Sequence, residues 1–361
     1  MIRVFVVDDS AFARRATTRV LAADPGVRVV GEAASGAEAL ARIPAARPDV
    51  VTLDLEMPKM NGLVVLRALL ARDPGLRVVM LSAHTQEGAE ATLEALAAGA
   101  SDFLDKSRYG LMDLESFGRD LVQRVRALGE SCRKSRGVEE QKSGEARRGS
   151  RIFGSSAPPL IADARRLDLC VLGASTGGPA AIQRILEQLP ADFPAPIAIV
   201  QHMPPGFTRP FAARLDAHCR LTVTEAEDGE RLAPGRVVIA PAGRHLTVTS
   251  SLGVVLSPEP ADARHIPSVN VMMLSAARAR PGRVLGVLLT GMGDDGADGM
   301  VAIRAGGGVT VAESEESCVV YGMPRAAAKR GGVERLLPIH ALAEWLAAVR
   351  AASPGAAPAP R

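Results

Sequence analysis

Residues 167–186 read LDLCVLGASTGGPAAIQRIL: an apolar run, a turn of small residues, and then a stretch with helical spacing. This order predicts a buried strand that passes through a tight turn into a helix. Strand-like apolar runs recur further on, at residues 197–201, 237–240, 284–290 and 309–312. Strands that alternate with helices are typical of a parallel sheet with crossover connections. We therefore expect a doubly wound parallel α/β domain over residues 167–349.

The same alternation precedes this domain, over residues 1–128. The strand-like runs here are 2–7, 27–33, 50–54, 77–82 and 102–104. They predict a first doubly wound domain, five-stranded and flavodoxin-like. A length of 361 residues also favours two domains, because it exceeds what one core usually organises. We expect residues 129–166, rich in Gly, Ser, Glu, Lys and Arg, to form a flexible basic linker, and the Pro/Ala-rich residues 350–361 to be disordered.

The net charge of +3 lies in the predicted linker. Residues 129–152 contain seven basic and four acidic residues, so the rest of the chain sums to zero. A short basic linker is usually a solvated segment, and we expect no nucleic-acid binding. The four cysteines are far apart without a C-x-x-C pair, no secretory signal opens the chain, and no apolar stretch reaches the roughly 18 residues of a membrane span. These features favour a cytoplasmic protein that does not insert into a membrane.

Polar side chains follow four predicted strands of the first domain. They are Asp8 with Asp9, then Asp54, Ser82 and Lys106. Because the carboxyl ends of parallel strands meet at one edge of the sheet, we expect these side chains to converge. Clustered carboxylates suit Mg²⁺, while a lysine and a hydroxyl suit phosphoryl oxygens. The set therefore predicts formation of an aspartyl phosphate.

The turn of the second domain contains a candidate nucleophile. Residues 173–177 fit G-x-S-x-G, a pattern in which glycines expose a serine, Ser175, on a sharp turn before a helix. Two other interpretations stay open at this point. The loop could cradle a dinucleotide pyrophosphate, or Ser175 could cap the helix.

Two further polar positions follow strands of the same domain. His202 comes directly after the run 197–201, where it could act as a general base. The glycine-rich stretch LLTGMGDDGADGM contains Asp294, Asp295 and Asp298, one of which could orient the histidine. Asp298 is also a plausible helix cap and Asp294 a plausible solvated loop residue, and spacing does not choose among the three.

The motifs of the first domain resemble the response-regulator receiver family. They are VVDDS, LDLEMPKMNG, LSAHT and DFLDK. The resemblance implies that Asp54 is the phosphoacceptor and that Phe103 occupies the position of a switch aromatic. The implied magnesium ligands are Asp8, Asp9, Asp54 and the Glu56 carbonyl. One departure is Ser107, which follows Lys106 where many receivers have proline and which puts a cis peptide bond there in doubt.

The motifs of the second domain resemble the CheB-type chemotaxis receptor methylesterases over residues 168–345. They are GASTGG, QHMPPGFT, APAGRHL, GVLLTGMGDDGADGM and SCVVYGMPRAA. The resemblance implies that Ser175 is the nucleophile, His202 the base and Asp295 the triad aspartate. It further implies an oxyanion hole at the backbone N–H of Met292, with Thr176 and Arg244 nearby. Many members read P-S-V-D where this chain has Asn270 in the last position.

Together the two resemblances imply a phosphorylation-activated serine hydrolase. Its expected substrate is a glutamate methyl ester on a cytoplasmic chemoreceptor helix, with glutamine deamidation as a second reaction. The expected phosphodonor is a chemotaxis histidine kinase, and the unphosphorylated receiver is expected to cover the hydrolase cleft. The resemblance also implies a monomer, with no cofactor in the hydrolase domain.

The sequence disfavours three competing interpretations. A receiver-linked transcription factor would need a basic helix-turn-helix, whereas residues 168–349 are strand-rich and near neutral. A nucleotide-binding oxidoreductase would want G-x-G-x-x-G, and Ser175 breaks that pattern. A pseudoenzyme that only binds receptors is disfavoured because all three triad candidates are retained.

Overall fold

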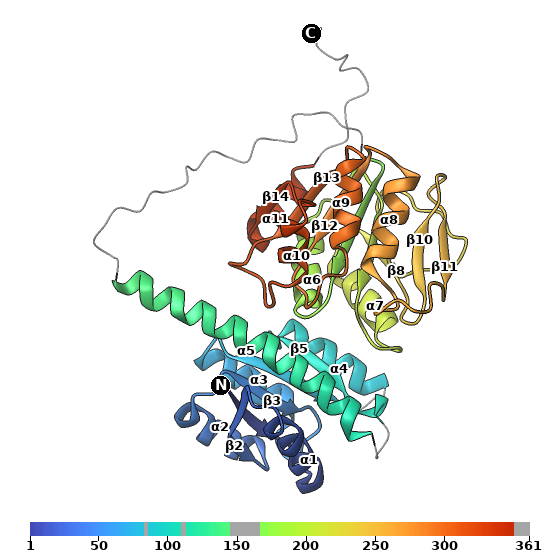
Figure 1. Ribbon diagram of the computed structural model, residues 1–361. Helices are drawn as coiled ribbons and strands as arrows, with labels where there is room; N and C mark the ends of the chain where they lie inside the picture. Colours follow the sequence, from blue (N-terminus) through green and yellow to red (C-terminus); the bar gives the residue numbers. More distant parts are fainter. Residues whose placement is uncertain (83–85, 110–112, 145–166, 350–361) are drawn as a thin grey trace. The chain divides into compact units, whose positions relative to one another are not determined.

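A computed structural model describes residues 1–82, 86–109, 113–144 and 167–349. The chain divides into two compact units, Met1–Ser150 and Arg151–Arg361 (Figure 1). The predicted disordered tail and the part of the predicted linker from residue 145 onward lie outside the described residues. In the described part of the chain, no helix is both long and apolar enough to cross a membrane.

The first unit is the predicted five-stranded parallel sheet. Its strands are β1 (Ile2–Val7), β2 (Val27–Ala33), β3 (Val50–Asp54), β4 (Arg77–Ser82) and β5 (Asp102–Asp105), in the order β2-β1-β3-β4-β5. Its helices are α1 (Ala11–Ala22), α2 (Gly36–Ala46), α3 (Gly62–Arg72), α4 (Gln86–Ala97) and α5 (Leu114–Gly144), with a short 3₁₀ turn η1 (Lys106–Arg108). Helix α1 packs on α5, whereas α3 contacts both α2 and α4, so helices cover both faces of the sheet.

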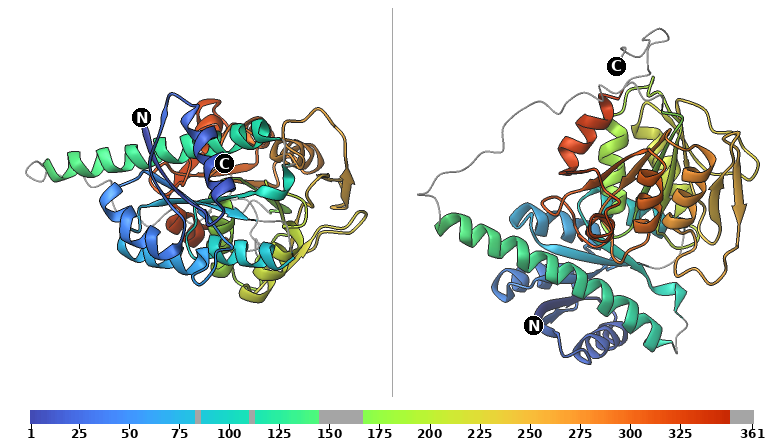
Figure 2. Two further views of the ribbon diagram at one scale, coloured as in Figure 1. Left: turned by 90° about the horizontal axis from the view of Figure 1, so that it is seen from below. Right: turned by 45° about the horizontal axis from the view of Figure 1, so that its top comes forward.

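The predicted linker is wrong over residues 129–144, which belong to helix α5. The linker was expected to begin at residue 129, but α5 continues to Gly144, and Figure 2 shows its C-terminal end projecting beyond the unit's other elements. The helix buries an apolar stripe formed by Leu121, Val125, Leu128 and Cys132, which are spaced four, three and four residues apart. Beyond this stripe, Glu, Lys, Arg and Gln have favourable helix propensity. Polar composition alone therefore did not mark the end of the helix.

The second unit contains a seven-stranded parallel sheet in the order β14-β13-β12-β6-β7-β9-β8. Its strands are β6 (Leu169–Ala174), β7 (Ile197–Gln201), β8 (Thr222–Glu225), β9 (Arg236–Ile239), β12 (Val284–Leu288), β13 (Val309–Glu313) and β14 (Arg335–Leu337). Its helices are α6 (Gly178–Gln188), α7 (Thr208–His218), α8 (Val269–Ala279), α9 (Ala297–Ala305), α10 (Met323–Lys329) and α11 (Ile339–Ala347). Helix α6 packs on α11 and α7, whereas α9 packs on α8 and α10, which confirms the doubly wound architecture.

Four strands of this unit were not expected from the sequence. Strands β8 and β14 form the two edges of the sheet, and β10 (His245–Val248) pairs antiparallel with β11 (Val254–Ser257) in a separate hairpin. Each has only three or four residues and carries partly exposed side chains. Such short runs give too little periodicity to be recognised.

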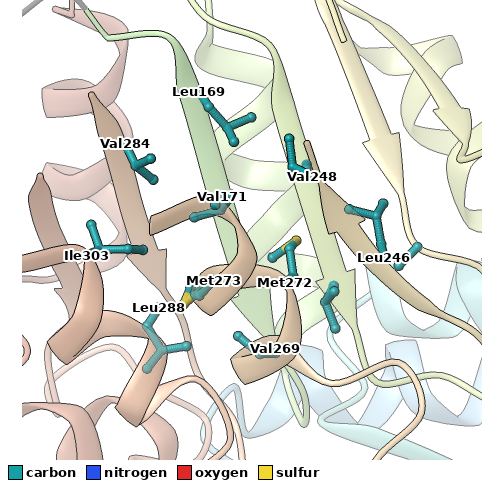
Figure 3. Close-up of a cluster of buried hydrophobic side chains, with 14 of the residues drawn as sticks. Leu169, Val171, Leu246, Val248, Val269, Met272, Met273, Val284, Leu288 and Ile303 are labelled. Carbon is teal, nitrogen blue, oxygen red and sulfur yellow. The ribbon is translucent and has the colours of Figure 1, made fainter. Parts of the chain in front are cut away.

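A buried apolar cluster joins the hairpin, helix α8 and the centre of the sheet (Figure 3). Val269, Met272 and Met273 of α8 lie in this cluster together with residues of β6 and β10, and all three are fully buried. The first of them, Val269, packs so closely on the end of β6 that a Cβ on Gly173 would lie 2.2 Å from its Cγ1. This packing holds the N-terminus of α8 at the carboxyl edge of the sheet.

Candidate functional site

The carboxyl edge of the first sheet holds three carboxylates. Asp8 and Asp9 follow β1, Asp54 ends β3, and one oxygen from each lies within 4.8 Å of the others. Among the described residues, Asp8 Oδ2 has no hydrogen-bond donor although it is buried. Burial raises the pKa of Asp54 to about 6 and also raises that of Asp8. Such crowded, partly unsatisfied oxygens fit the ligand preference of Mg²⁺.

Lys106 supplies the positive charge at this edge. It follows β5, and its Nζ donates to Asp54 Oδ1 at 2.7 Å and lies 3.6 Å from Asp8 Oδ2. Burial opposes the charge of the ammonium group, but the neighbouring carboxylates outweigh burial and raise the pKa of Lys106. The lysine therefore stays protonated where a phosphoryl group on Asp54 would lie.

The other receiver positions predicted from the sequence lie close to this edge or in the core. Ser82 ends β4, and its buried Oγ has no hydrogen-bond partner in the part of the chain that the structure describes. The side chain of Glu56 is exposed, two residues after Asp54. Phe103 is buried in β5. The hydroxyl and the N–H of Ser107 both donate to Asp105, and the cis peptide bonds of the described residues lie elsewhere.

The turn after β6 positions Ser175 in the second unit. Gly177 has a φ of +79° and forms the N-cap of α6, and a Cβ there would lie 2.6 Å from the Cβ of Val319. No side chain caps this helix, so the interpretation of Ser175 as a helix cap is wrong. The Ser175 N–H donates to the Thr290 carbonyl at 3.1 Å, and its own carbonyl accepts from Gln201 Nε2 at 3.0 Å. The backbone on both sides of the serine is therefore fixed.

His202 lies at the end of the neighbouring strand β7. Its backbone N–H donates to the Ala174 carbonyl at 3.2 Å, which puts it across from the residue that precedes Ser175. Its Nε2 lies 2.8 Å from Asp295 Oδ2, and since a carboxylate only accepts, the proton of the neutral ring is on Nε2. The buried Nδ1 has no partner among residues 1–82, 86–109, 113–144 and 167–349. Its lone pair is available to accept a proton.

Asp295 lies on the N-terminus of helix α8. Its Oδ1 accepts from the Asn270 N–H at 2.8 Å and from Ser268 Oγ at 2.9 Å, and its Oδ2 accepts from the Val269 N–H at 2.8 Å. Burial alone would raise the pKa of this carboxyl, but the bonds from His202 and the helix N-terminus outweigh burial and lower it to about 2. The group is a permanent carboxylate in the neutral pH range.

The structure distinguishes the three aspartates that spacing left open. Asp295 is 9% exposed and contacts His202. The side chains of Asp294 and Asp298 are 55% and 62% exposed, and both pair with Arg330. Asp298 is also not the cap of α9, since Gly296 holds that position. Of the three, only Asp295 is brought to the histidine.

The backbone at Met292 passes against the serine. A Cβ on Gly291 would lie 2.9 Å from the Cβ of Ser175. The Met292 N–H, one residue on, has no hydrogen-bond acceptor among the residues described. An unpaired N–H beside the candidate nucleophile has the character of an oxyanion-hole donor.

The other two substrate candidates differ in their position. Thr176 directly follows Ser175 and is buried, and its carbonyl accepts from Thr290 Oγ1 at 2.9 Å. Arg244 is exposed, and its guanidinium donates to the Leu256 carbonyl across the β10–β11 hairpin at 2.7 Å. No hydrogen bond joins Arg244 to Ser175, His202 or Asp295, all of which are described.

Several site residues were missed by reasoning from the sequence. Gln201 and Ser268 hold Ser175 and Asp295, and His265 stacks on His202 with ring centroids 4.2 Å apart. The available signal was proximity in sequence: Gln201 directly precedes His202, and Ser268 lies two residues before Asn270. The contact of His265 depends on a loop that periodicity does not predict.

The departure at Asn270 also has a structural explanation. Its Oδ1 accepts from the Gly299 N–H at 2.9 Å, in the first turn of α9, while its own N–H donates to Asp295. A neutral amide oxygen thus satisfies the start of α9 without a second negative charge beside Asp295.

Comparisons with known proteins cover both units. A family model described as CheB methylesterase matches residues 170–346, and one described as response regulator receiver domain matches residues 4–112. The protein-glutamate methylesterase/protein-glutamine glutaminase 1 of Oleidesulfovibrio alaskensis is 43% identical, over 95% of this chain and 98% of that protein. The corresponding protein 2 of Nitratidesulfovibrio vulgaris is 45% identical, over 95% and 98%. The crystal structure of the Thermotoga maritima CheB methylesterase catalytic domain is 41% identical, covers 50% of this chain and 97% of that chain, and has a TM-score of 0.49.

Proposed function

The chain belongs to the CheB methylesterase family, and from this premise we propose that Ser175, His202 and Asp295 form the catalytic triad of a receiver-regulated esterase. Its activities are those in the names of its curated relatives, protein-glutamate methylesterase and protein-glutamine glutaminase. The observation that carries the proposal is the His202–Asp295 pair, which leaves Nδ1 unpaired at the strand end next to the serine turn.

In the proposed mechanism, Ser175 Oγ attacks the γ-carbonyl of a glutamate methyl ester while His202 Nδ1 takes its proton. The histidine returns this proton to the leaving methanol, and an acyl-enzyme remains. A water then gives a proton to His202 as it attacks the acyl carbonyl, and His202 passes this proton to Ser175 Oγ as glutamate is released. With glutamine, ammonia leaves in place of methanol. Proton transfer by a positioned histidine contributes about 10² to 10⁴ fold.

Asp295 stabilises the imidazolium that forms in both steps. Its lowered pKa supports this role, because the group stays ionised when His202 is protonated. We assign the Met292 N–H to the oxyanion, a donor of a kind that contributes on the order of 10² to 10³ fold. Thr176 is a second candidate contact at the reacting carbonyl. Arg244 is exposed on the hairpin, so any role in substrate binding would be at the periphery.

We propose that the receiver takes a phosphoryl group on Asp54 from a histidine kinase. Asp8, Asp9, Asp54 and the Glu56 carbonyl would hold Mg²⁺, which neutralises phosphoryl oxygens when bound. Lys106 Nζ and Ser82 Oγ would then bind the transferred group, and Phe103 would respond as the switch aromatic. The substrates that we infer are methylated helices of chemoreceptors. The receiver domain would extend through α5, and the catalytic domain would span residues 167–349.

The experiment is methanol release from a methylated receptor fragment, with and without a small-molecule phosphodonor. We expect wild type to be active and stimulated by the donor, Ser175→Ala to be inactive, and Asp54→Asn to keep only its basal rate. Asp294→Asn is the control for a substitution near the site that should not affect activity, since that aspartate is exposed and paired with Arg330. This variant should release methanol as wild type does. Circular dichroism and the unfolding midpoint of Ser175→Ala should match those of wild type, which separates loss of chemistry from misfolding of the second unit. Methanol release by Ser175→Ala would refute the assignment of the nucleophile.

A further inference from the structure

A third histidine lies behind the active site. His245 opens β10 and is 0% exposed. Its Nδ1 accepts from the Ser268 N–H at 3.0 Å, and its Nε2 lies 3.2 Å from the Pro260 carbonyl. Because one nitrogen accepts from an N–H and the other faces a carbonyl, the ring is neutral with its proton on Nε2. The proposed chemistry does not use this side chain.

Ser268 connects this ring to the triad aspartate. Its Oγ donates to Asp295 Oδ1 at 2.9 Å and accepts from the Val271 N–H at 3.3 Å, so it is also the N-cap of α8. The backbone N–H of the same residue is the one that His245 holds. A single residue therefore separates the buried imidazole from the group that orients His202.

The His245 ring is also hydrogen-bonded at both ends of the segment that carries His265. Pro260 and Ser268 flank residues 261–267, and His245 is hydrogen-bonded to both of them. Within this segment, His265 stacks on His202 with an interplanar angle of 20°. The two contacts of the catalytic base, Asp295 on its edge and His265 on its face, both depend on backbone that His245 holds.

We propose that His245 is a positioning residue of the active site. Through Ser268 it holds Asp295 and the His265 segment in the positions from which they contact the ring of His202. This inference rests on the triad assigned above. A displacement of about 1 Å at a reacting group can cost on the order of 100-fold in rate, so the loss of such a support should lower kcat. Substrate binding should change little, because His245 is fully buried.

Two substitutions separate the two hydrogen bonds. In His245→Asn the amide oxygen replaces Nδ1 and keeps the acceptor for Ser268, whereas in His245→Gln the amide nitrogen replaces Nε2 and keeps the donor to Pro260. We expect His245→Gln to lower kcat by roughly tenfold or more, with KM within about twofold of wild type. His245→Asn should retain most of the wild-type kcat.

Ser275→Ala is the matched control. Ser275 is 6% exposed, and its Oγ accepts from the Val248 N–H at 3.0 Å and donates to the Met272 carbonyl at 2.7 Å. It joins the other end of β10 to α8 without touching the triad or the residues that bind it. This variant should lower the midpoint of thermal unfolding as the His245 variants do, but leave kcat unchanged.

The outcomes separate the inference from the proposed function. Equal kcat in wild type, His245→Gln and Ser275→Ala would overturn the inference while wild type and Ser175→Ala behave as expected. Loss of kcat in His245→Asn with retention in His245→Gln would also overturn it. In that case kcat would depend on the hydrogen bond to Pro260 and not on the one from Ser268. An inactive wild type, or an active Ser175→Ala, would instead count against the proposed function. Circular dichroism and the unfolding midpoint of each variant establish that it is folded.

Discussion

At the scale of the residue, the decisive group of the second unit is a carboxylate surrounded by donors. Asp295 accepts four hydrogen bonds, from His202, Ser268, Val269 and Asn270, while it is almost completely buried. A buried carboxylate is costly unless it is well paired, and here a helix N-terminus supplies two of the donors. The same arrangement orients the histidine and keeps its partner charged.

This environment predicts how stability depends on pH. The folded pKa of Asp295 is about 2, and an unfolded aspartate has about 3.9. Because the folded value is lower, the carboxylate contributes roughly 2 kcal/mol above pH 4, and this contribution is lost as the pH falls toward 2. In urea unfolding of a protein made of residues 167–349, Asp295→Asn should therefore be less stable than wild type at pH 7, with a gap that narrows toward pH 3. Asp294→Asn should show no such gap, and a pH-independent difference for Asp295→Asn would contradict the assigned environment.

At the scale of the element, helix N-termini support the candidate site of the second unit. The N-termini of α6 and α8 adjoin Ser175 and Asp295, and the turn before α6 requires glycine at residue 177. In the first unit, the site lies at strand ends, and the helix that departs from expectation is α5, which extends beyond the length expected from the sequence. Its buried stripe reaches Cys132, so the receiver fold includes residues that composition assigned to a linker.

The extent of α5 can be tested with neighbouring substitutions. Cys132 is 3% exposed, whereas the adjacent Arg133 is exposed. Cys132→Lys buries an ammonium group beside the guanidinium of Arg77 and should cost roughly 2 to 3 kcal/mol in the free energy of unfolding of the first unit, while Arg133→Lys should stay within about 0.5 kcal/mol. Urea unfolding of the two variants measures the difference. Equal stability would mean that residue 132 belongs to a solvated linker after all.

At the scale of the whole molecule, the chain consists of two units that each contain a complete sheet, core and candidate site. The three residues of the proposed triad come from the second unit, and the proposed phosphorylation-site residues come from the first. The proposed hydrolysis and the proposed phosphorylation therefore use residues from separate units of the chain.

This division predicts the behaviour of the catalytic unit by itself. A protein made of residues 167–349 should release methanol from a methylated receptor fragment at a rate that a phosphodonor does not change. The full chain should respond to the donor, because only it contains Asp54. The measurement is the initial rate of both proteins with and without donor. A donor response of residues 167–349 would contradict the proposed separation.

Much of this protein is determined by local sequence. The strand ends that carry Asp8, Asp54, Ser175 and His202 were predictable, because apolar runs mark strands and parallel strands share one carboxyl edge. The glycine turn at Ser175 was also predictable, since its conformation depends on neighbouring residues. These features require no knowledge of distant contacts.

Only the tertiary structure decided which aspartate meets the histidine and what supports the pair. His202 and Asp295 are 93 positions apart, and Ser268 and Asp295 are 27 apart. Three aspartates in one glycine-rich loop look alike in sequence, and they differ only in whether packing of α8 on the sheet buries them against donors or leaves them exposed. The end of α5 has the same origin, because burial of Cys132 against the receiver outweighs the polar composition around it. Burial and long-range hydrogen bonding are properties of the folded chain, and residue spacing does not encode them.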